Sequence, residues 1–141
     1  MATIEKEQIL KELLEIKDLR ERFAYLIQKG KSHAEFSDDE KIEKNIIKGC
    51  NSQLWLIPEL VEGKVNFRVD SDAAIPKGIA AVLAEAYSGL TPQEILVTEP
   101  DFLKEAGIEQ HLSMNRRNGL SNICKQIKLY AMAFQALAAT Q

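Results

Sequence analysis

Cys50 is the residue of this sequence whose type and neighbours most directly indicate chemistry. It follows Gly49, which permits unusual backbone angles, and it precedes Asn51 and Ser52, which favour turns. We therefore expect Cys50 at the tip of a loop between two short strands. Backbone N–H groups in such a turn can point toward a sulfur anion and favour the thiolate, the reactive form of cysteine. The residues alone leave two interpretations open, a reactive thiol and an incidental loop cysteine.

The second cysteine, Cys124, is expected to have a structural role. It shares one face of a predicted helix with Leu120, Ile127 and Ala131, which lie at helical spacing. A free cysteine on an apolar stripe packs as a small hydrophobic residue. We therefore expect one accessible thiol and one packed thiol.

The remaining candidate side chains do not complete a familiar catalytic or metal-binding set. His33 and His111 are not placed by a motif, whereas a cysteine hydrolase pairs its thiol with histidine and a peroxidase commonly uses a resolving cysteine. The sequence has no paired Cys or His spacing for zinc. An iron–sulfur scaffold would need several converging thiolates or histidines. A scaffold-like protein and a stand-alone thiol enzyme stay as alternatives to a thiol carrier.

Composition narrows the class of protein further. The length of 141 residues predicts a single domain, residues 1–141. The net charge of −3 argues against a nucleic-acid-binding protein, which is usually basic. There is no apolar run of about 18 residues, so we expect no membrane span. Residues 1–20 lack the apolar stretch of a signal peptide, and the two cysteines fit a reducing compartment, so we expect a cytoplasmic protein.

The first half of the chain predicts helices followed by a small antiparallel sheet. Apolar residues at helical spacing indicate two helices, or one bent near Lys17, with Asp18 as a cap and Gly30 as the stop. Residues 37–40 have a capping-box pattern for a short turn. Residues 54–57 and 65–69 read as strands joined by a turn at residues 62–63, and residues 46–47 are expected to add a third short strand.

The second half predicts further helices. Asp72 could cap a helix whose apolar face includes residues 79–87, although Pro76 allows a start a few residues later. Residues 91–94 combine a cap, proline and glutamate at the start of a short helix. Ser113 is expected to cap a last long helix. The order of elements predicts an α+β fold, with helices against one face of a sheet of about three strands.

Four blocks of the sequence, taken in order, resemble the SufE/CsdE family of sulfur-acceptor proteins. Residues 49–55 match the pattern G-C-x-S-x-x-W, and residues 71–78 match S-D-A-x-I-x-K-G. Residues 90–95 match L-T-P-x-E-I, and residues 112–120 match L-x-x-x-R-x-x-G-L. The chain departs from the usual pattern at Pro76, where an aliphatic residue is common, and at residues 114–115, but both departures lie outside the cysteine motif.

The resemblance implies a SufE-like fold and a function in sulfur transfer. Proteins of this family take persulfide sulfur from a cysteine desulfurase and carry it toward iron–sulfur cluster assembly. Cys50 matches the acceptor cysteine. The pyridoxal phosphate of the reaction belongs to the partner, a SufS- or CsdA-like desulfurase, and no cofactor is expected on this chain. The protein would be an accessory that stimulates the desulfurase, with an iron–sulfur scaffold as the downstream partner.

The same resemblance gives roles to further residues. Arg116 is expected to contact the desulfurase, because folding alone gives little reason for a cation near a helix N-terminus. Asp72 is expected to act as a helix cap, with a second role in partner binding and release of the loop. Gly49, Ser52 and Trp55 are expected to support the loop, and Trp55 could equally be part of the sheet core.

Overall fold

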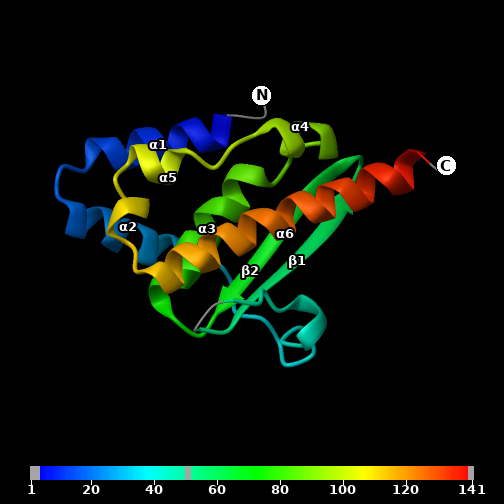
Figure 1. Ribbon diagram of the computed structural model, residues 1–141, viewed down its shortest axis with the longest axis horizontal. Helices are drawn as coiled ribbons and strands as arrows, with labels where there is room; N and C mark the ends of the chain where they lie inside the picture. The colour runs from blue at the N-terminus through cyan, green and yellow to red at the C-terminus, as the bar shows by residue number, and fades with distance from the viewer. Residues whose placement is uncertain (1–3, 50–51, 140–141) are drawn as a thin grey trace.

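A computed structural model describes residues 4–49 and 52–139 of the chain (Figure 1). Helices and strands are combined in an α+β arrangement, as the sequence predicts. The α-helices are α1 (Ile4–Glu15), α2 (Leu19–Lys31), α3 (Ala74–Tyr87), α4 (Pro92–Val97), α5 (Phe102–Glu105) and α6 (Met114–Ala139). Two short 3₁₀ helices, η1 (Glu43–Asn45) and η2 (Glu109–His111), and two strands, β1 (Leu54–Val61) and β2 (Lys64–Ser71), complete the described elements.

The two strands form the antiparallel hairpin that the sequence predicts. Leu54 pairs with Ser71 at one end, and Val61 pairs with Lys64 at the other. Glu62 and Gly63 connect the strands with positive φ angles of 52° and 80°. Two successive residues with positive φ match the right-handed twist of a hairpin, which explains the tight connection.

The helix α3 lies at the centre of the fold. It packs against α1, α2, β2 and α6, and Figure 1 shows α1 and α2 on one side of it and the hairpin with α6 on the other. Its crossing with α2 is close, because a Cβ at Gly78 would overlap the carbonyl group of Leu26. This close approach explains the glycine of the K-G pair in the second sequence block as a packing requirement.

The predicted third strand is wrong. Ile46 forms only an isolated bridge to Trp55, and the Ile47 N–H group donates a hydrogen bond to the Leu54 C=O group at 2.8 Å. The helix η1 ends directly before this bridge, and a turn with a positive φ at Gly49 follows it. The extended stretch between them is too short to form a strand, so the described sheet has two strands.

Several predicted helix ends are confirmed by their caps. Asp18 Oδ1 accepts a hydrogen bond from the Arg20 N–H group at 2.9 Å, which starts α2 after a break in the helical backbone. Thr91 and Glu94 form a complete capping box at the start of α4. The helix α3, however, begins at Ala74 rather than after Pro76. Proline is tolerated there because the first N–H groups of a helix have no partner within the helix.

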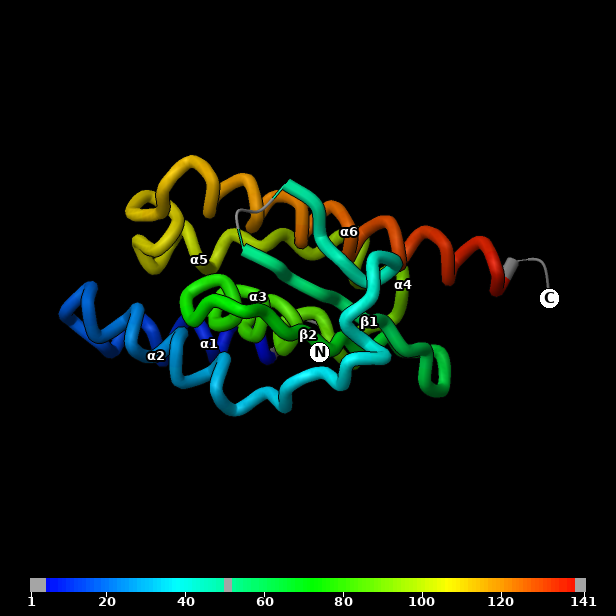
Figure 2. The backbone as a smooth tube through the Cα atoms, turned by 90° about the horizontal axis from the view of Figure 1, so that it is seen from below, coloured from blue at the N-terminus to red at the C-terminus, as the bar shows by residue number. Residues whose placement is uncertain are grey.

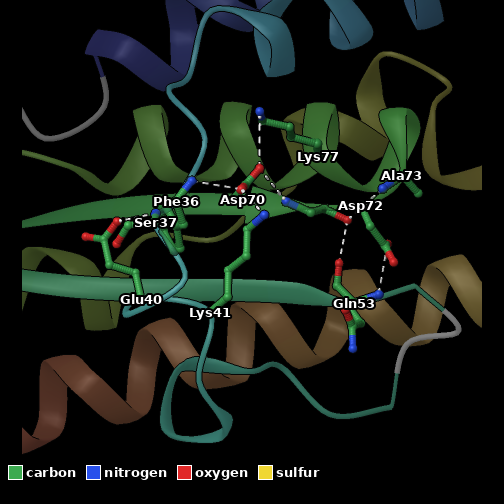
Figure 3. A network of polar contacts seen from close by, with 10 residues as sticks. Phe36, Ser37, Glu40, Lys41, Gln53, Asp70, Asp72, Ala73 and Lys77 are labelled. Atoms are coloured by element: carbon green, nitrogen blue, oxygen red, sulfur yellow. Dashed lines mark hydrogen bonds and ion pairs between the residues drawn. The ribbon is translucent and has the colours of Figure 1, made fainter.

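Asp70 is a centre of polar contacts where β2, α3 and residues 36–41 meet (Figure 3). Its carboxylate accepts hydrogen bonds from the N–H groups of Phe36 and Ser71, at 2.9 and 2.8 Å, and Lys77 Nζ lies 3.2 Å away. Burial alone raises the pKa of Asp70, but the hydrogen bonds from Phe36, Lys77 and Ser71 together outweigh it and lower the pKa below its usual value. The charged carboxylate therefore ties residues 36–41 to the sheet.

The substitution Asp70→Asn is expected to lower the free energy of unfolding by about 1–3 kcal/mol near neutral pH, because the amide cannot satisfy this set of donors. The folded-state pKa lies below the unfolded value of about 3.9. The carboxylate therefore contributes stability above that pH and loses it as the pH falls through the folded-state pKa. Denaturant unfolding at several pH values should show that the difference in free energy of unfolding between wild type and variant becomes smaller in acid.

Asp39→Asn is the matched control, because Asp39 is exposed and has no hydrogen bond or ion pair among the described residues. Its free energy of unfolding should follow that of the wild type. If the difference in free energy of unfolding between wild type and Asp70→Asn stayed constant down to acid pH, the proposed role of the charge would be contradicted.

Among the described helices, none has the length and apolar character needed to cross a membrane.

Candidate functional site

Cys50 and Asn51 lie outside the residues that the structure describes. The prediction that Cys50 lies at the tip of a loop therefore stays a prediction. The structure describes the residues on either side, namely Lys48 and Gly49 before Cys50 and Ser52 to Leu54 after Asn51.

On the amino-terminal side, the chain lies against α6. The side-chain amide of Asn122 donates a hydrogen bond from Nδ2 to the Lys48 C=O group at 2.7 Å. Gly49 has φ of +89°, a conformation that other residues rarely adopt. Figure 2 shows the segment that precedes residue 50 running beside α6. Side chains of residues 43–49 and of α6, among them Asn122 and Gln126, line a groove between the two. The conformational freedom predicted for Gly49 is thus used in the fold.

On the carboxyl-terminal side, Gln53 is held by the end of β2 (Figure 3). Its N–H group donates to Asp72 Oδ1 at 3.0 Å, and its C=O group accepts from Ser71 Oγ at 2.7 Å and from the Asp72 N–H group at 3.2 Å. The prediction that Asp72 caps α3 is wrong. Ala73 occupies the N-cap position without a side-chain bond, because the Asp72 carboxylate is engaged by Gln53 instead.

A cavity of about 330 Å³ lies next to Ser52. Its walls come from three parts of the chain that are distant in sequence: the residues after Cys50, the first half of α3 and the first half of α6. The lining includes Ser52, Leu54, Pro76, Ile79, Arg116, Gly119 and Leu120. Leu54, Pro76, Ile79, Leu120 and Ile123 are the apolar residues of the lining, and Ser52, Ser113, Asn115 and Arg116 add polar groups. A concave space that combines apolar walls with polar groups is typical of a binding site.

Arg116 is exposed at the edge of this cavity. Its backbone N–H group donates to Ser113 Oγ at 3.3 Å, so Ser113 caps α6 as predicted. Within residues 4–49 and 52–139, no carboxylate forms an ion pair with the Arg116 guanidinium. The side chain therefore keeps its donors available for another molecule.

Trp55 does not line the cavity. It is buried on the face of the hairpin that looks away from the main core, where the Lys41 ammonium lies 5.4 Å from the ring centre and Ile46 bridges to its strand. Trp55 thus supports the chain before Cys50 through this bridge. Of the apolar residues 54–57, only Leu54 lines the cavity.

The comparison with known families decides the affiliation. The family model of the SufE domain, described as an Fe-S metabolism associated domain, matches residues 7–131. The chain belongs to the SufE family. An uncharacterized SufE-like protein of Synechocystis sp. is 38% identical over 118 residues, which cover 84% of this chain and 74% of that protein. Membership in the SufE family associates the chain with iron–sulfur metabolism.

The SufE assignment agrees with a comparison of folds. The solution structure of a hypothetical protein from Thermus thermophilus superposes with a TM-score of 0.77. The match covers 94% of this chain and 97% of that one, at 18% sequence identity. At this identity the likeness concerns the fold alone, and it supports the α+β architecture.

Three of the four SufE sequence blocks meet at the cavity. The cysteine block contributes Ser52 and Leu54, the S-D-A block contributes Pro76, and the last block contributes Arg116 and Gly119. The L-T-P block lies instead at α4, where it builds the capping box. Asp72 and Gly49 lie outside the cavity lining. Asp72 bonds the chain that follows Asn51, and Gly49 turns the chain that precedes Cys50.

Cys124 has the packed role that the sequence predicts. The side chain is partly buried and packs against the hydrophobic core. Burial raises the pKa of the Cys124 thiol to about 12, with nearby Lys128 lowering it slightly. At neutral pH this thiol is protonated, and a protonated thiol is a poor nucleophile.

Sequence reasoning did not identify Asn122. The residue lies just after the last block of the SufE pattern, and its partner Lys48 is 74 residues away in the chain. An asparagine on the surface of a predicted helix gives no sign of such a contact. The only available signal was the glycine at position 49, which indicates that another group comes close to the backbone.

Proposed function

We propose that this protein accepts persulfide sulfur from a cysteine desulfurase on Cys50 and passes it on for iron–sulfur cluster assembly. The observation that carries the proposal is the meeting of three SufE blocks at one cavity beside Ser52, two residues after Cys50. Leu54, Ile79 and Leu120 meet there as part of the hydrophobic core, but the exposed Arg116 has no ion-pair partner among the described residues. A task in sulfur transfer beside the cysteine accounts for this unpaired charge at the cavity edge.

The transfer step is an exchange between a thiolate and a persulfide. The Cys50 thiolate attacks the outer sulfur of the persulfide on the desulfurase, a new S–S bond forms, and the S–S bond of the desulfurase breaks. The desulfurase cysteine leaves as a thiolate, and Cys50 becomes a persulfide. A later acceptor thiolate repeats the exchange and releases Cys50. No electrons are gained or lost overall, so the step needs no redox cofactor on this chain.

The cavity suits a carrier that must protect its cargo. A persulfide is readily lost to small thiols that reach it through water, so shielding between uptake and delivery is an advantage. Leu54, Ile79 and Leu120 provide an apolar wall, and Ser52 stands at the side from which the cysteine segment continues. We propose that the Cys50 persulfide is sheltered against this wall and extends from it when a partner is bound.

Asp72 and Arg116 have different roles in this proposal. Asp72 holds the Gln53 N–H group, so the loss of this bond would free the chain that follows Cys50. Arg116 stays available at the cavity edge and binds a carboxylate or carbonyl group of the desulfurase. Removal of the persulfide by the carrier would also increase the turnover of the desulfurase, because the product no longer occupies its cysteine.

Incubation with a SufS-like desulfurase, its pyridoxal phosphate and free cysteine is expected to add one sulfur atom to this protein. Intact-mass analysis would detect the addition, and peptide mapping should place it on the Cys50 peptide. The reductant dithiothreitol should remove it, because a persulfide is exchanged by thiols. The reaction without free cysteine is the control.

Two results would contradict the proposed function. One is the absence of added sulfur when the desulfurase itself is charged with persulfide. The other is sulfur on the Cys124 peptide, which would require a partly buried thiol with a raised pKa to compete with Cys50.

A further inference from the structure

The chain on the two sides of Cys50 and Asn51 is held in unequal ways. On the carboxyl-terminal side, Gln53 has three hydrogen bonds to Ser71 and Asp72 at the end of β2. On the amino-terminal side, the bond from Asn122 Nδ2 to the Lys48 C=O group is the only one that the described residues make to Lys48 or Gly49. Ile47, which precedes them, donates to the Leu54 C=O group at 2.8 Å, so the position of the amino-terminal arm, residues 48–49, depends on this backbone bond behind it and on one side chain of α6.

The contact between Asn122 and the amino-terminal arm is also a steric one. A Cβ placed on Gly49 would overlap the Asn122 side-chain amide. The amide thus packs directly on the backbone of the residue that precedes Cys50. The positive φ of Gly49 turns the chain at this point, so the packing and the turn occur together.

We propose that Asn122 is a positioning residue that holds the amino-terminal arm against α6 and limits how readily Cys50 extends toward a partner. The part of this inference that concerns extension toward a partner rests on the proposed function. The bond is near the surface, and the net contribution of such a bond is small enough to be broken on each transfer. A stronger attachment would keep the cysteine from its partner, and no attachment would leave a persulfide unprotected.

The place of Asn122 on α6 fits this role. Arg116 lies six residues earlier on the same helix, roughly 9 Å along the helix axis at about 1.5 Å per residue. At about 3.6 residues per turn the two side chains point roughly 120° apart around the axis, so a desulfurase must cover both the cavity edge and the groove to reach the amino-terminal arm. The free energy of that binding can then be used to break the Asn122 bond and extend the arm.

The variants Asn122→Asp and Asn122→Ala test the inference in the free protein. Aspartate keeps the size of the side chain but has no donor for the Lys48 C=O group, and alanine removes the side chain. Alkylation of Cys50 by iodoacetamide, followed by mass spectrometry of its peptide, is expected to be about fivefold faster in both variants. Fivefold corresponds to roughly 1 kcal/mol, the net contribution of one hydrogen bond.

Gln126→Ala is the matched control. Gln126 lines the same groove one turn later on α6, and among the described residues its amide makes no hydrogen bond. This variant should alkylate at the wild-type rate, and all the variants should melt within a few degrees of the wild type. Equal alkylation of Cys50 in wild type and both Asn122 variants would overturn the inference.

Kinetics with the desulfurase provide a second measurement that a purely structural role would not change. The KM for this protein as sulfur acceptor is expected to fall about fivefold in Asn122→Ala, with kcat unchanged, because the arm no longer has to be released. A lower kcat at unchanged KM would overturn the inference. If the wild type accepts no sulfur at all, the proposed function fails, whereas the alkylation experiment still tests the role of Asn122.

Discussion

Replacing Cys50 by serine is expected to abolish sulfur acceptance and to leave the free energy of unfolding nearly unchanged. A serine hydroxyl is not ionised near neutral pH without a general base, and it does not displace a thiolate from a persulfide. We expect little effect on folding, because the chain on both sides of Cys50 is held by bonds that the thiol does not make, from Asn122, Ser71 and Asp72. Intact-mass analysis after incubation with a charged desulfurase, together with denaturant unfolding, would measure both effects.

Cys124→Ser is the matched control for this prediction. It should accept sulfur as the wild type does, but its free energy of unfolding should fall by about 1–3 kcal/mol, because a hydroxyl group replaces a thiol that packs against the apolar core. The raised pKa of Cys124 supports the same division of roles, since a protonated, packed thiol takes no part in exchange. If Cys124→Ser were inactive and Cys50→Ser active, the assignment of the acceptor would be reversed.

The parts of the fold that the sequence predicted well depend on local patterns. The hairpin follows from an apolar run at residues 54–57 and from alternating apolar residues at 65–69, with Glu62 and Gly63 between them. The helix α4 follows from a threonine, a proline and a glutamate in sequence. Such signals come from residues that are close together in the sequence. The contacts that form them are therefore almost independent of the rest of the chain.

The errors came from competition between local and distant partners. Asp72 has a suitable position for a helix cap, but the Gln53 N–H group, nineteen residues away, binds its carboxylate instead. Residues 46–47 have strand-forming side chains, but η1 and the turn at Gly49 leave no length for a strand. Trp55 could by its sequence be either loop support or sheet core, and it is buried on the other face of the hairpin, with the Lys41 ammonium 5.4 Å from its ring centre. A single sequence carries no signal for which distant group completes each contact.

The residues around the cavity and the groove show which parts of the site the sequence could identify and which it could not. Ser52 and Arg116 were predicted as site residues because they belong to the SufE sequence blocks, and both line the cavity. Asn122 could not be found in this way, because its role depends on the close approach of Gly49 to α6. Resemblance to a family identifies shared residues, whereas a contact of this kind needs the three-dimensional arrangement.

Arg116→Ala is expected to weaken binding to the desulfurase by about 2–5 kcal/mol, the range for a paired charge that becomes buried in an interface. The dissociation constant would then rise about thirtyfold or more, mainly through faster dissociation. The guanidinium lines the cavity edge, is exposed and has no ion-pair partner among the described residues, so folding does not use its charge. Titration calorimetry and surface-binding kinetics would measure the change.

Arg117→Ala separates a specific contact from a general effect of positive charge. Arg117 is adjacent and exposed on α6 but does not line the cavity, so its removal should weaken binding only slightly and should act mainly on the association rate and its salt dependence. Both arginines lie in the first turn of α6, where the helix dipole disfavours cations, so neither substitution should destabilise the fold. Cys50 should stay reactive toward iodoacetamide in both variants. An unchanged affinity for Arg116→Ala would show that this arginine is a solvated surface charge, and the desulfurase would then have to recognise another part of the cavity edge.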